Sequence, residues 1–554
     1  MALLITLLSV LLGLAVLTRL FPYAFHLLGR TIGNSIQSKT LHRREILLSR
    51  AVAEEHDPKT TTKPTASSSA SLDSDWEKVS SNGTQTPKSS PTTTSSSDSS
   101  YSGVIAFFHP FCNAGGGGER VLFAAILATQ QRYPHALCVV YTGDHDASRD
   151  QILANARNRF NIHLQPSRVV FLYLTTREWV LASKWPRFTL LGQSIGSLIL
   201  GWDAFTLLAP DIMIDTMGYA FVLALSKWLF PKVPTAAYVH YPTISTDMLQ
   251  SLKSTDGSQG LNAGSGKGFR GLVKQFYWQK FASLYSWVGG SVDIVMTNSS
   301  WTQSHISTLW NPSRASRQST PRPITVVYPP CAVAELQEKI PVTLENEKDR
   351  QPHILYIAQF RPEKMHTTII DAFHTFLREH HAPTPSSSRP RLILVGSVRD
   401  DHDEKRVYKL RLQAQEVKDS VDFVVNAKWP QILEFLKSSK VGVNGMWNEH
   451  FGIGVVEYQA AGLVAVVNDS GGPKADIVVE VDGGRTGFHA TTPKEFADGF
   501  AQALALKDEE AFEMRCRARK SSWRFSEEVF IEAWTKELVG LVDLTGQEGR
   551  RKDT

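Results

Sequence analysis

The chain has 554 residues, of which 42% are hydrophobic and 20% are charged, an ordinary composition for a globular protein. A chain of this length exceeds what one hydrophobic core accommodates, so two domains with additional segments are expected. The net charge of +5 is too weak to indicate nucleic-acid binding. The four cysteines form no CxxC pair, which argues against structural zinc and a disulfide framework and favours a reducing compartment.

The first 30 residues are almost wholly apolar, with runs at 2–17 and 20–28 separated by Arg19. Such a stretch is long enough to span a bilayer. No basic segment precedes it and no clear small-x-small cleavage site follows it, which favours an uncleaved anchor over a cleaved signal peptide. Because the basic residues follow this segment, the positive-inside rule predicts a single-pass anchor with the body of the protein in the cytosol.

Residues 31–100 are expected to form a disordered tether that is basic at first and then rich in Ser, Thr and Pro. Order is predicted to resume in a first domain over residues 101–330. There, apolar strands such as 104–108 and 136–141 alternate with helical stretches such as 119–131. This alternation predicts a parallel sheet with helices on both faces.

Two segments of the first domain leave alternatives open. Residues 190–230 are unusually apolar, but aspartates and prolines divide them into pieces of under about 14 residues, which favours buried core over a second membrane span. Residues 264–290 interleave Lys and Arg with aromatic residues. They fit a helix at a membrane interface or a surface helix with a buried aromatic face equally well.

A second alternation of strands and helices follows a Pro-rich, charged connection near residues 321–352. It predicts a second domain over residues 345–525, with a closing helix and tail over 526–554. The fold class is therefore α/β, with two doubly wound, Rossmann-like domains. A ligand is expected in the cleft between them, at the carboxyl ends of the strands.

Glu449 and Glu457 bracket the stretch EHFGIGVVE in the second domain. Glycines such as Gly452 let the backbone approach a phosphate, and a helix starting near Gly454 directs its free N–H groups and positive dipole end at that phosphate. Glu449 would lie near a sugar and Glu457 near ribose hydroxyls, from which a carboxylate can accept hydrogen bonds. Glutamate pairs at this spacing also arise by chance, but the FG and AAG surroundings favour a nucleotide-sugar site.

Three further motifs follow predicted strands. Arg361 and Lys364 follow the first strand of the second domain and could clamp a diphosphate, although such cations are often only solvated. His240 ends strand 236–239 and could hydrogen-bond a reacting sugar, although a lone histidine is more often structural. A loop of four glycines between the first strand and its helix could cradle a phosphate or simply be flexible. These glycines are Gly115, Gly116, Gly117 and Gly118.

Together these motifs resemble the retaining glycosyltransferases of the GT-B class that carry an E-x7-E motif, over about residues 103–540. The glycine loop, VHYPTIS, QFRPEK and NEHFGIGVVE are similar in particular to the α-1,2-mannosyltransferases of the dolichol pathway. The resemblance implies GDP-mannose as donor and dolichyl-diphosphate-linked Man3GlcNAc2 as acceptor. It implies addition of two mannoses on the cytosolic face of the endoplasmic reticulum membrane, for protein N-glycosylation, with other mannosyltransferases of the pathway as candidate partners.

Carried onto this sequence, the resemblance makes His240 and Glu449 the catalytic residues. The donor site it implies consists of Arg361, Lys364, Glu449, Phe451, Gly452, Ile453 and Glu457. Many members of the family have an Arg directly after a Gly, five residues before the Lys. Gln359 stands at that position here, so the role of Arg361 is less firmly implied than that of Lys364.

The resemblance also implies a mechanism that retains the anomeric configuration and needs neither a protein nucleophile nor a metal ion. The acidic stretch 400–403 looks like metal ligands but is interpreted as a solvated turn. Two alternatives stay open: a GT-B glycosyltransferase with a UDP-sugar donor and a soluble acceptor, and an inactive scaffold of the same fold.

Overall fold

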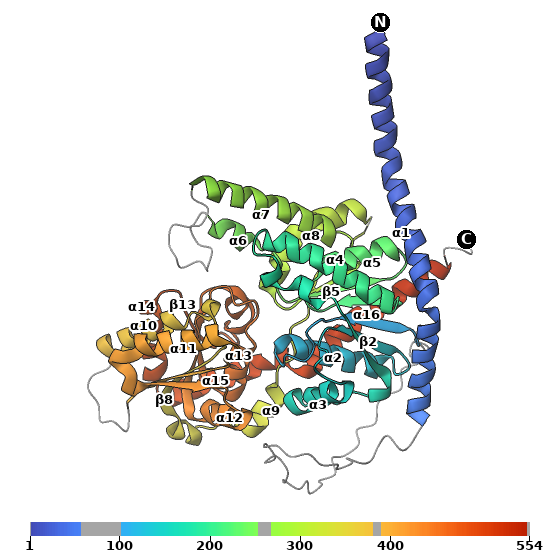
Figure 1. The fold of residues 1–554 in the computed structure, drawn as a ribbon. Coiled ribbons are helices and arrows are strands. Elements are labelled where there is room, and N and C mark those ends of the chain that lie inside the picture. The colour runs from blue at the N-terminus through green and yellow to red at the C-terminus, as the bar shows by residue number, and fades with distance from the viewer. Residues whose placement is uncertain (1, 57–100, 253–267, 319, 381–388, 551–554) are drawn as a thin grey trace.

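Two parallel β-sheets organise the protein, each with helices on both faces (Figure 1). The computed structural model describes residues 2–56, 101–252, 268–318, 320–380 and 389–550. Strands of the first sheet lie in the order β3-β2-β1-β4-β5-β6-β7, and those of the second in the order β10-β9-β8-β11-β12-β13. The two doubly wound domains that the sequence predicts are therefore confirmed.

The first sheet comprises β1 (Val104–Phe108), β2 (Leu137–Thr142), β3 (Val169–Tyr173), β4 (Ile212–Asp215), β5 (Thr235–Val239), β6 (Ile294–Thr297) and β7 (Thr325–Val326). The helices of this domain are α2 (Gly117–Arg132), α3 (Arg149–Phe160), α4 (Thr189–Leu207), α5 (Ala220–Leu229), α6 (Thr246–Ser251), α7 (Gly268–Gly289) and α8 (Ser300–Arg317).

The second sheet comprises β8 (Gln351–Ile357), β9 (Arg391–Gly396), β10 (Val421–Val425), β11 (Ser439–Asn444), β12 (Val464–Asn468) and β13 (Gly487–Ala490). Its helices are α9 (Val333–Lys339), α10 (His366–Glu379), α11 (Asp401–Gln413), α12 (Trp429–Ser438), α13 (Ile453–Ala461), α14 (Pro493–Ala505) and α15 (Asp508–Ser522). Two long helices, α1 (Ala2–His56) and α16 (Glu527–Arg550), begin and end the fold.

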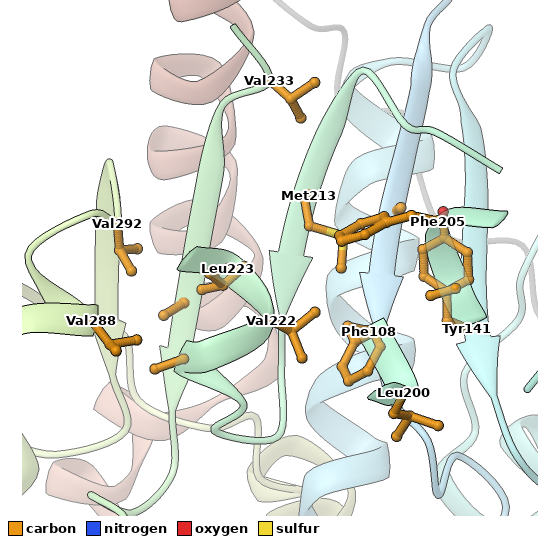
Figure 2. Close-up of a cluster of buried hydrophobic side chains, with 14 of the residues drawn as sticks. Phe108, Tyr141, Leu200, Phe205, Met213, Val222, Leu223, Val233, Val288 and Val292 are labelled. Carbon is orange, nitrogen blue, oxygen red and sulfur yellow. The ribbon is translucent and has the colours of Figure 1, made fainter. Parts of the chain in front are cut away.

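The central strand β1 is fully buried and separates two hydrophobic cores. Phe108 lies in the core beneath α4, α5, α7 and α8, together with Tyr141 and Leu200 (Figure 2). Its neighbour Phe107 points to the opposite face, because successive side chains of a strand alternate. There it stacks on Trp534 of α16 with ring centroids 6.4 Å apart, so the closing helix completes the first domain rather than the second.

The helix α1 is longer than the predicted anchor, and its second half lies along the first domain (Figure 1). Arg44 pairs with Asp211 at 2.7 Å in this contact. The expectation of a tether is therefore wrong for residues 31–56, where tertiary contacts hold a helix against the domain. The rest of the predicted tether, residues 57–100, lies outside the described residues.

The two ambiguous segments are both helical in part. Residues 190–230 fold into α4, β4 and α5, much of which is buried in the first core. In α7, Trp278 and Tyr285 are buried whereas Phe269 and Phe276 are exposed, so the aromatic residues occupy both faces. Within the ranges that the structure describes, no helix combines the length and apolar character needed to cross a bilayer.

Candidate active site

A cavity of about 580 Å³ lies between the two domains and is lined by loops that follow strands of both sheets. The first domain contributes Gly117, Gly118 and His240, and the second contributes Lys364 and both glutamates of the EHFGIGVVE motif. Residues from four separate motifs therefore meet at one site. The predicted placement of a ligand between the domains is consistent with this geometry.

Lys364 and Glu449 form an ion pair at the cavity wall, with Nζ 2.5 Å from Oε2. Lys364 ends a short 3₁₀ turn after β8, and Glu449 lies in the loop between β11 and α13. Asn444 donates a weaker hydrogen bond to the same carboxylate oxygen at 3.4 Å. Burial alone would raise the pKa of Glu449, but the charge and hydrogen bond of Lys364 hold it below its usual value.

The helix α13 begins at the cavity, so its free N–H groups and positive dipole end face the space where an anion would bind. Gly452 precedes it with φ +103°, a left-handed backbone conformation that side chains other than glycine rarely adopt. Glu457 lies one turn into α13 and also lines the cavity. Burial raises the pKa of Glu457 to about 7.

The glycine loop of the first domain closes the opposite side of the cavity. A Cβ atom on Gly117 would lie 2.6 Å from Cδ1 of Ile453, so the glycine permits α2 and α13 to begin close together. The side chain of Glu119 accepts a hydrogen bond of 2.7 Å from the backbone N–H of Gly116 and fixes the loop. The loop is thus a defined helix start, with the free N–H groups of α2 near the cavity.

His240 is held at the cavity by a main-chain contact. Its Nε2 lies 3.1 Å from the carbonyl oxygen of Thr216, and because a carbonyl only accepts, Nε2 carries the proton. Burial lowers the pKa of His240 to about 4, so the ring is neutral at pH 7 and its Nδ1 can accept a hydrogen bond. The hydroxyl of Thr216 lies 2.8 Å from Nδ1 of the buried His109, which supports the loop from behind.

Three of the predicted site residues do not line the cavity. Arg361 lies next to Glu363 at 3.7 Å and is one-third exposed. Gly115 contacts Arg159, and Gly116 forms the capping turn of α2. Lys364 is thus the cation of the QFRPEK motif that the fold brings to the cavity.

His450 was not predicted as a site residue from the sequence, although it directly follows Glu449. Its ring lies against Tyr241, with centroids 4.1 Å apart, and against Trp301 at 5.5 Å. Both partners belong to the first domain. On the other side of Glu449, Asn448 donates a hydrogen bond of 2.7 Å to Asp247.

These contacts hold the two neighbours of Glu449 against the opposite domain. We call Tyr241, Asp247, Trp301, Asn448 and His450 the interdomain clamp. Adjacency to His240 and Glu449 in the sequence was the available signal for three of these residues, Tyr241, Asn448 and His450. The pairing itself depends on how the domains face each other, which no local pattern encodes.

Comparison with known proteins identifies the family. Residues 102–310 match the family model described as ALG11 mannosyltransferase N-terminus, and residues 338–521 match Glycosyl transferases group 1. A Neurospora crassa protein named GDP-Man:Man(3)GlcNAc(2)-PP-Dol alpha-1,2-mannosyltransferase is 55% identical over 538 residues, covering 95% of each chain. This chain belongs to that mannosyltransferase family.

A human member of the family with the same name is 43% identical over 431 residues, covering 77% of this chain and 85% of the human one. Solved structures share the fold at much lower identity. An Anabaena protein, HepE, in complex with UDP-glucose aligns with a TM-score of 0.51 at 15% identity, covering 79% of this chain and 100% of its own. The likeness supports the GT-B architecture alone.

Proposed function

We propose that this enzyme transfers mannose from GDP-mannose in α-1,2 linkage to dolichyl-diphosphate-linked Man3GlcNAc2, adding the fourth and fifth mannoses for protein N-glycosylation. The observation that carries the proposal is the meeting of Lys364, Glu449, Glu457, His240 and the glycine loop at one interdomain cavity. The chain is also 55% identical, over 95% of its length, to a relative named for this reaction.

In the proposed mechanism, the donor diphosphate binds between Lys364 and the N-terminus of α13, which together stabilise the charge that develops on it as it leaves. Glu449 contacts the mannose and Glu457 the ribose hydroxyls. Nδ1 of His240 accepts a hydrogen bond from a sugar hydroxyl. These side chains orient the donor so that the acceptor hydroxyl attacks the anomeric carbon of mannose, C1. The attack comes on the same face from which the diphosphate departs.

The acceptor oxygen forms its bond to C1 while the bond from C1 to the phosphate oxygen breaks. The departing phosphate oxygen takes the proton of the acceptor hydroxyl, so GDP leaves protonated and the anomeric configuration is retained. The proposal includes no metal ion, because Lys364 and the amides of α13 supply the positive charge. Activity that persists in excess EDTA is therefore expected.

We further propose that residues 1–30 anchor the enzyme in the endoplasmic reticulum membrane, with both domains in the cytosol. The first half of α1 extends from the same side of the molecule that carries α7 (Figure 1). On α7 the exposed side chains of Phe269, Leu272 and Phe276 suit a membrane interface. This arrangement supports access to a lipid-linked acceptor.

The test is to incubate the full chain in detergent with GDP-mannose and dolichyl-diphosphate-linked Man3GlcNAc2, and to separate the released glycans by size. Products with four and five mannoses are expected, and none with UDP-glucose as donor. A Glu449→Ala variant that still binds GDP is the control. Transfer from UDP-glucose to a soluble acceptor would favour the alternative enzyme, and wild-type protein that binds GDP without any transfer would indicate an inactive scaffold.

A further inference from the structure

A second cavity, of about 810 Å³, lies on the first domain between α1 and α8. Its walls include Tyr23, His26 and Arg30 from α1, Lys227 from α5 and Arg317 from α8. It shares no lining residue with the interdomain cavity. The reaction proposed above does not use it.

The charges in this cavity are unbalanced. Lys227 is neutralised by Asp293, whose Oδ2 lies 2.8 Å from Nζ. Arg30 and Arg317 form no ion pair with a carboxylate in the part of the chain that the structure describes. The guanidinium of Arg317 instead lies 4.7 Å from the ring centre of Trp287. Two unneutralised guanidinium groups at one cavity suit a phosphate, whose oxygens match the planar array of N–H donors.

The position of the cavity along α1 suggests where such a phosphate comes from. A bilayer core takes about 20 helical residues, at 1.5 Å per residue. With residues 2–21 of the proposed anchor in the bilayer core, Tyr23 to Arg30 at its end lie roughly 3 to 14 Å beyond that core, at headgroup depth. Tyr23 and Trp287 are 77% and 57% exposed beside the cavity. Tyrosine and tryptophan are the residues enriched at that depth.

We propose that this cavity binds the phosphate of an anionic phospholipid in the leaflet that faces the two domains. Arg30 and Arg317 hold the phosphate, while Tyr23 and Trp287 lie among the headgroups. The bound lipid then joins α1 to α8 and fixes the tilt of the first domain on the membrane. This inference rests on the anchor proposed above, and the cytosolic leaflet supplies anionic lipid.

The experiment measures binding of short-chain phosphatidylserine and phosphatidylcholine to the full chain in neutral maltoside micelles, by native mass spectrometry. We expect the wild type to bind phosphatidylserine at least fivefold more tightly than phosphatidylcholine. Arg30→Gln with Arg317→Gln should abolish this preference, and the two Arg→Lys changes should restore part of it. Lys405→Gln with Lys409→Gln, a charge-matched pair on α11, should leave it unchanged.

Retention of mannosyl transfer in neutral micelles by the Arg30→Gln, Arg317→Gln variant would show that it is folded. An equal preference for phosphatidylserine in the wild type and this variant would overturn the proposal that this cavity binds the lipid phosphate. Displacement of the lipid by equimolar inorganic phosphate would also overturn it in favour of a free-anion site. Carbonate extraction of membranes tests the anchor separately: release of the wild-type chain would remove the depth argument and with it the lipid assignment.

Discussion

At the scale of single residues, the ion pair of Lys364 and Glu449 is the strongest electrostatic contact at the cavity wall. Both side chains are largely buried, so removing one partner leaves the other charge poorly solvated. The lowered pKa of Glu449 means that the pair stabilises the fold above pH 4.5, and that this stabilisation is lost as the pH falls through the folded-state pKa.

We therefore predict that Lys364→Met lowers the free energy of unfolding by about 2 kcal/mol at pH 7. The difference from wild type should shrink towards pH 4, because burial without the charge of Lys364 raises the pKa of Glu449 and lets the variant protonate it more readily than the wild type. Adding Glu449→Gln to Lys364→Met should recover part of the loss. Denaturant titrations at the two pH values measure these effects, and a loss of equal size at both would contradict the charge argument.

Glu457 should behave in the opposite way, because burial raises its pKa from 4.5 to about 7. Between these values the folded state holds a proton that the unfolded state has lost, so this group makes the protein less stable as the pH rises towards 7. We predict that Glu457→Gln raises the melting temperature at pH 8 relative to wild type and has little effect at pH 4.

The same titration should affect donor binding, because an ionised Glu457 accepts hydrogen bonds from both ribose hydroxyls. Affinity for GDP, measured by calorimetry, should rise in the wild type as the pH passes through 7. In Glu457→Gln it should be weaker and independent of pH in that range. A pH dependence that survives the substitution would assign the titration to another group.

At the scale of elements, the second half of α1 is part of the first domain. Ile36 and Ala51 are buried in the first core, and the main-chain N–H of Ala209 donates a hydrogen bond of 3.3 Å to Thr40. The carboxylate of Glu55 pairs with Arg168. Residues 31–56 therefore act as a structural element of the first domain.

Deletion of residues 1–56 should consequently lower the melting temperature of the protein by at least several degrees and promote aggregation, since it exposes the apolar surface under α1. Deletion of residues 1–20 should leave the melting temperature within about 2 °C of the full chain. Scanning calorimetry of the full chain and both truncated chains in one detergent measures the three melting temperatures. Equal melting temperatures for the two truncated chains would show that the contacts of residues 31–56 contribute nothing to the stability of the first domain.

At the scale of the whole molecule, the interdomain clamp sets how the two halves of the site face each other. The carboxylate of Asp247 accepts a hydrogen bond of 2.7 Å from the side chain of Asn448. Its Oδ2 also lies 3.3 Å from Nε2 of His305. Ser300 of α8 also bonds through its backbone N–H to Asp476 of the second domain at 2.9 Å. These hydrogen bonds flank Glu449 and the loop after β5. The relative placement of the two domains and the geometry of the site are therefore coupled.

Asp247→Ala should therefore reduce kcat/KM for GDP-mannose by about 10- to 100-fold, because it loosens the position of Glu449 without removing a group that touches the donor. Small-angle scattering should show a larger radius of gyration than in wild type. Asp371→Ala on the surface of α10 is the matched control. An unchanged radius of gyration together with full activity would refute the coupling between domain placement and site geometry.

Several parts of this architecture could be predicted from local pattern. An apolar run bounded by loops predicted β1 at its observed limits, and the glycine-containing EHFGIGVVE motif predicted the start of α13 to within a residue. Strands β4, β6, β7 and β13 were missed because they have four residues or fewer, which is too short for any periodicity. Helix 31–56 was missed because its stability comes from contacts with the first domain.

The sequence by itself determined the class of site, because glycines, cations and carboxylates that follow strands are chemical requirements of a phosphate and a sugar. Only the tertiary structure decided which of them meet: Lys364 reaches Glu449 while Arg361 does not line the cavity. It alone also revealed the interdomain clamp and the second cavity. Both depend on side chains far apart in the chain, and the packing of whole domains and helices brings such residues together.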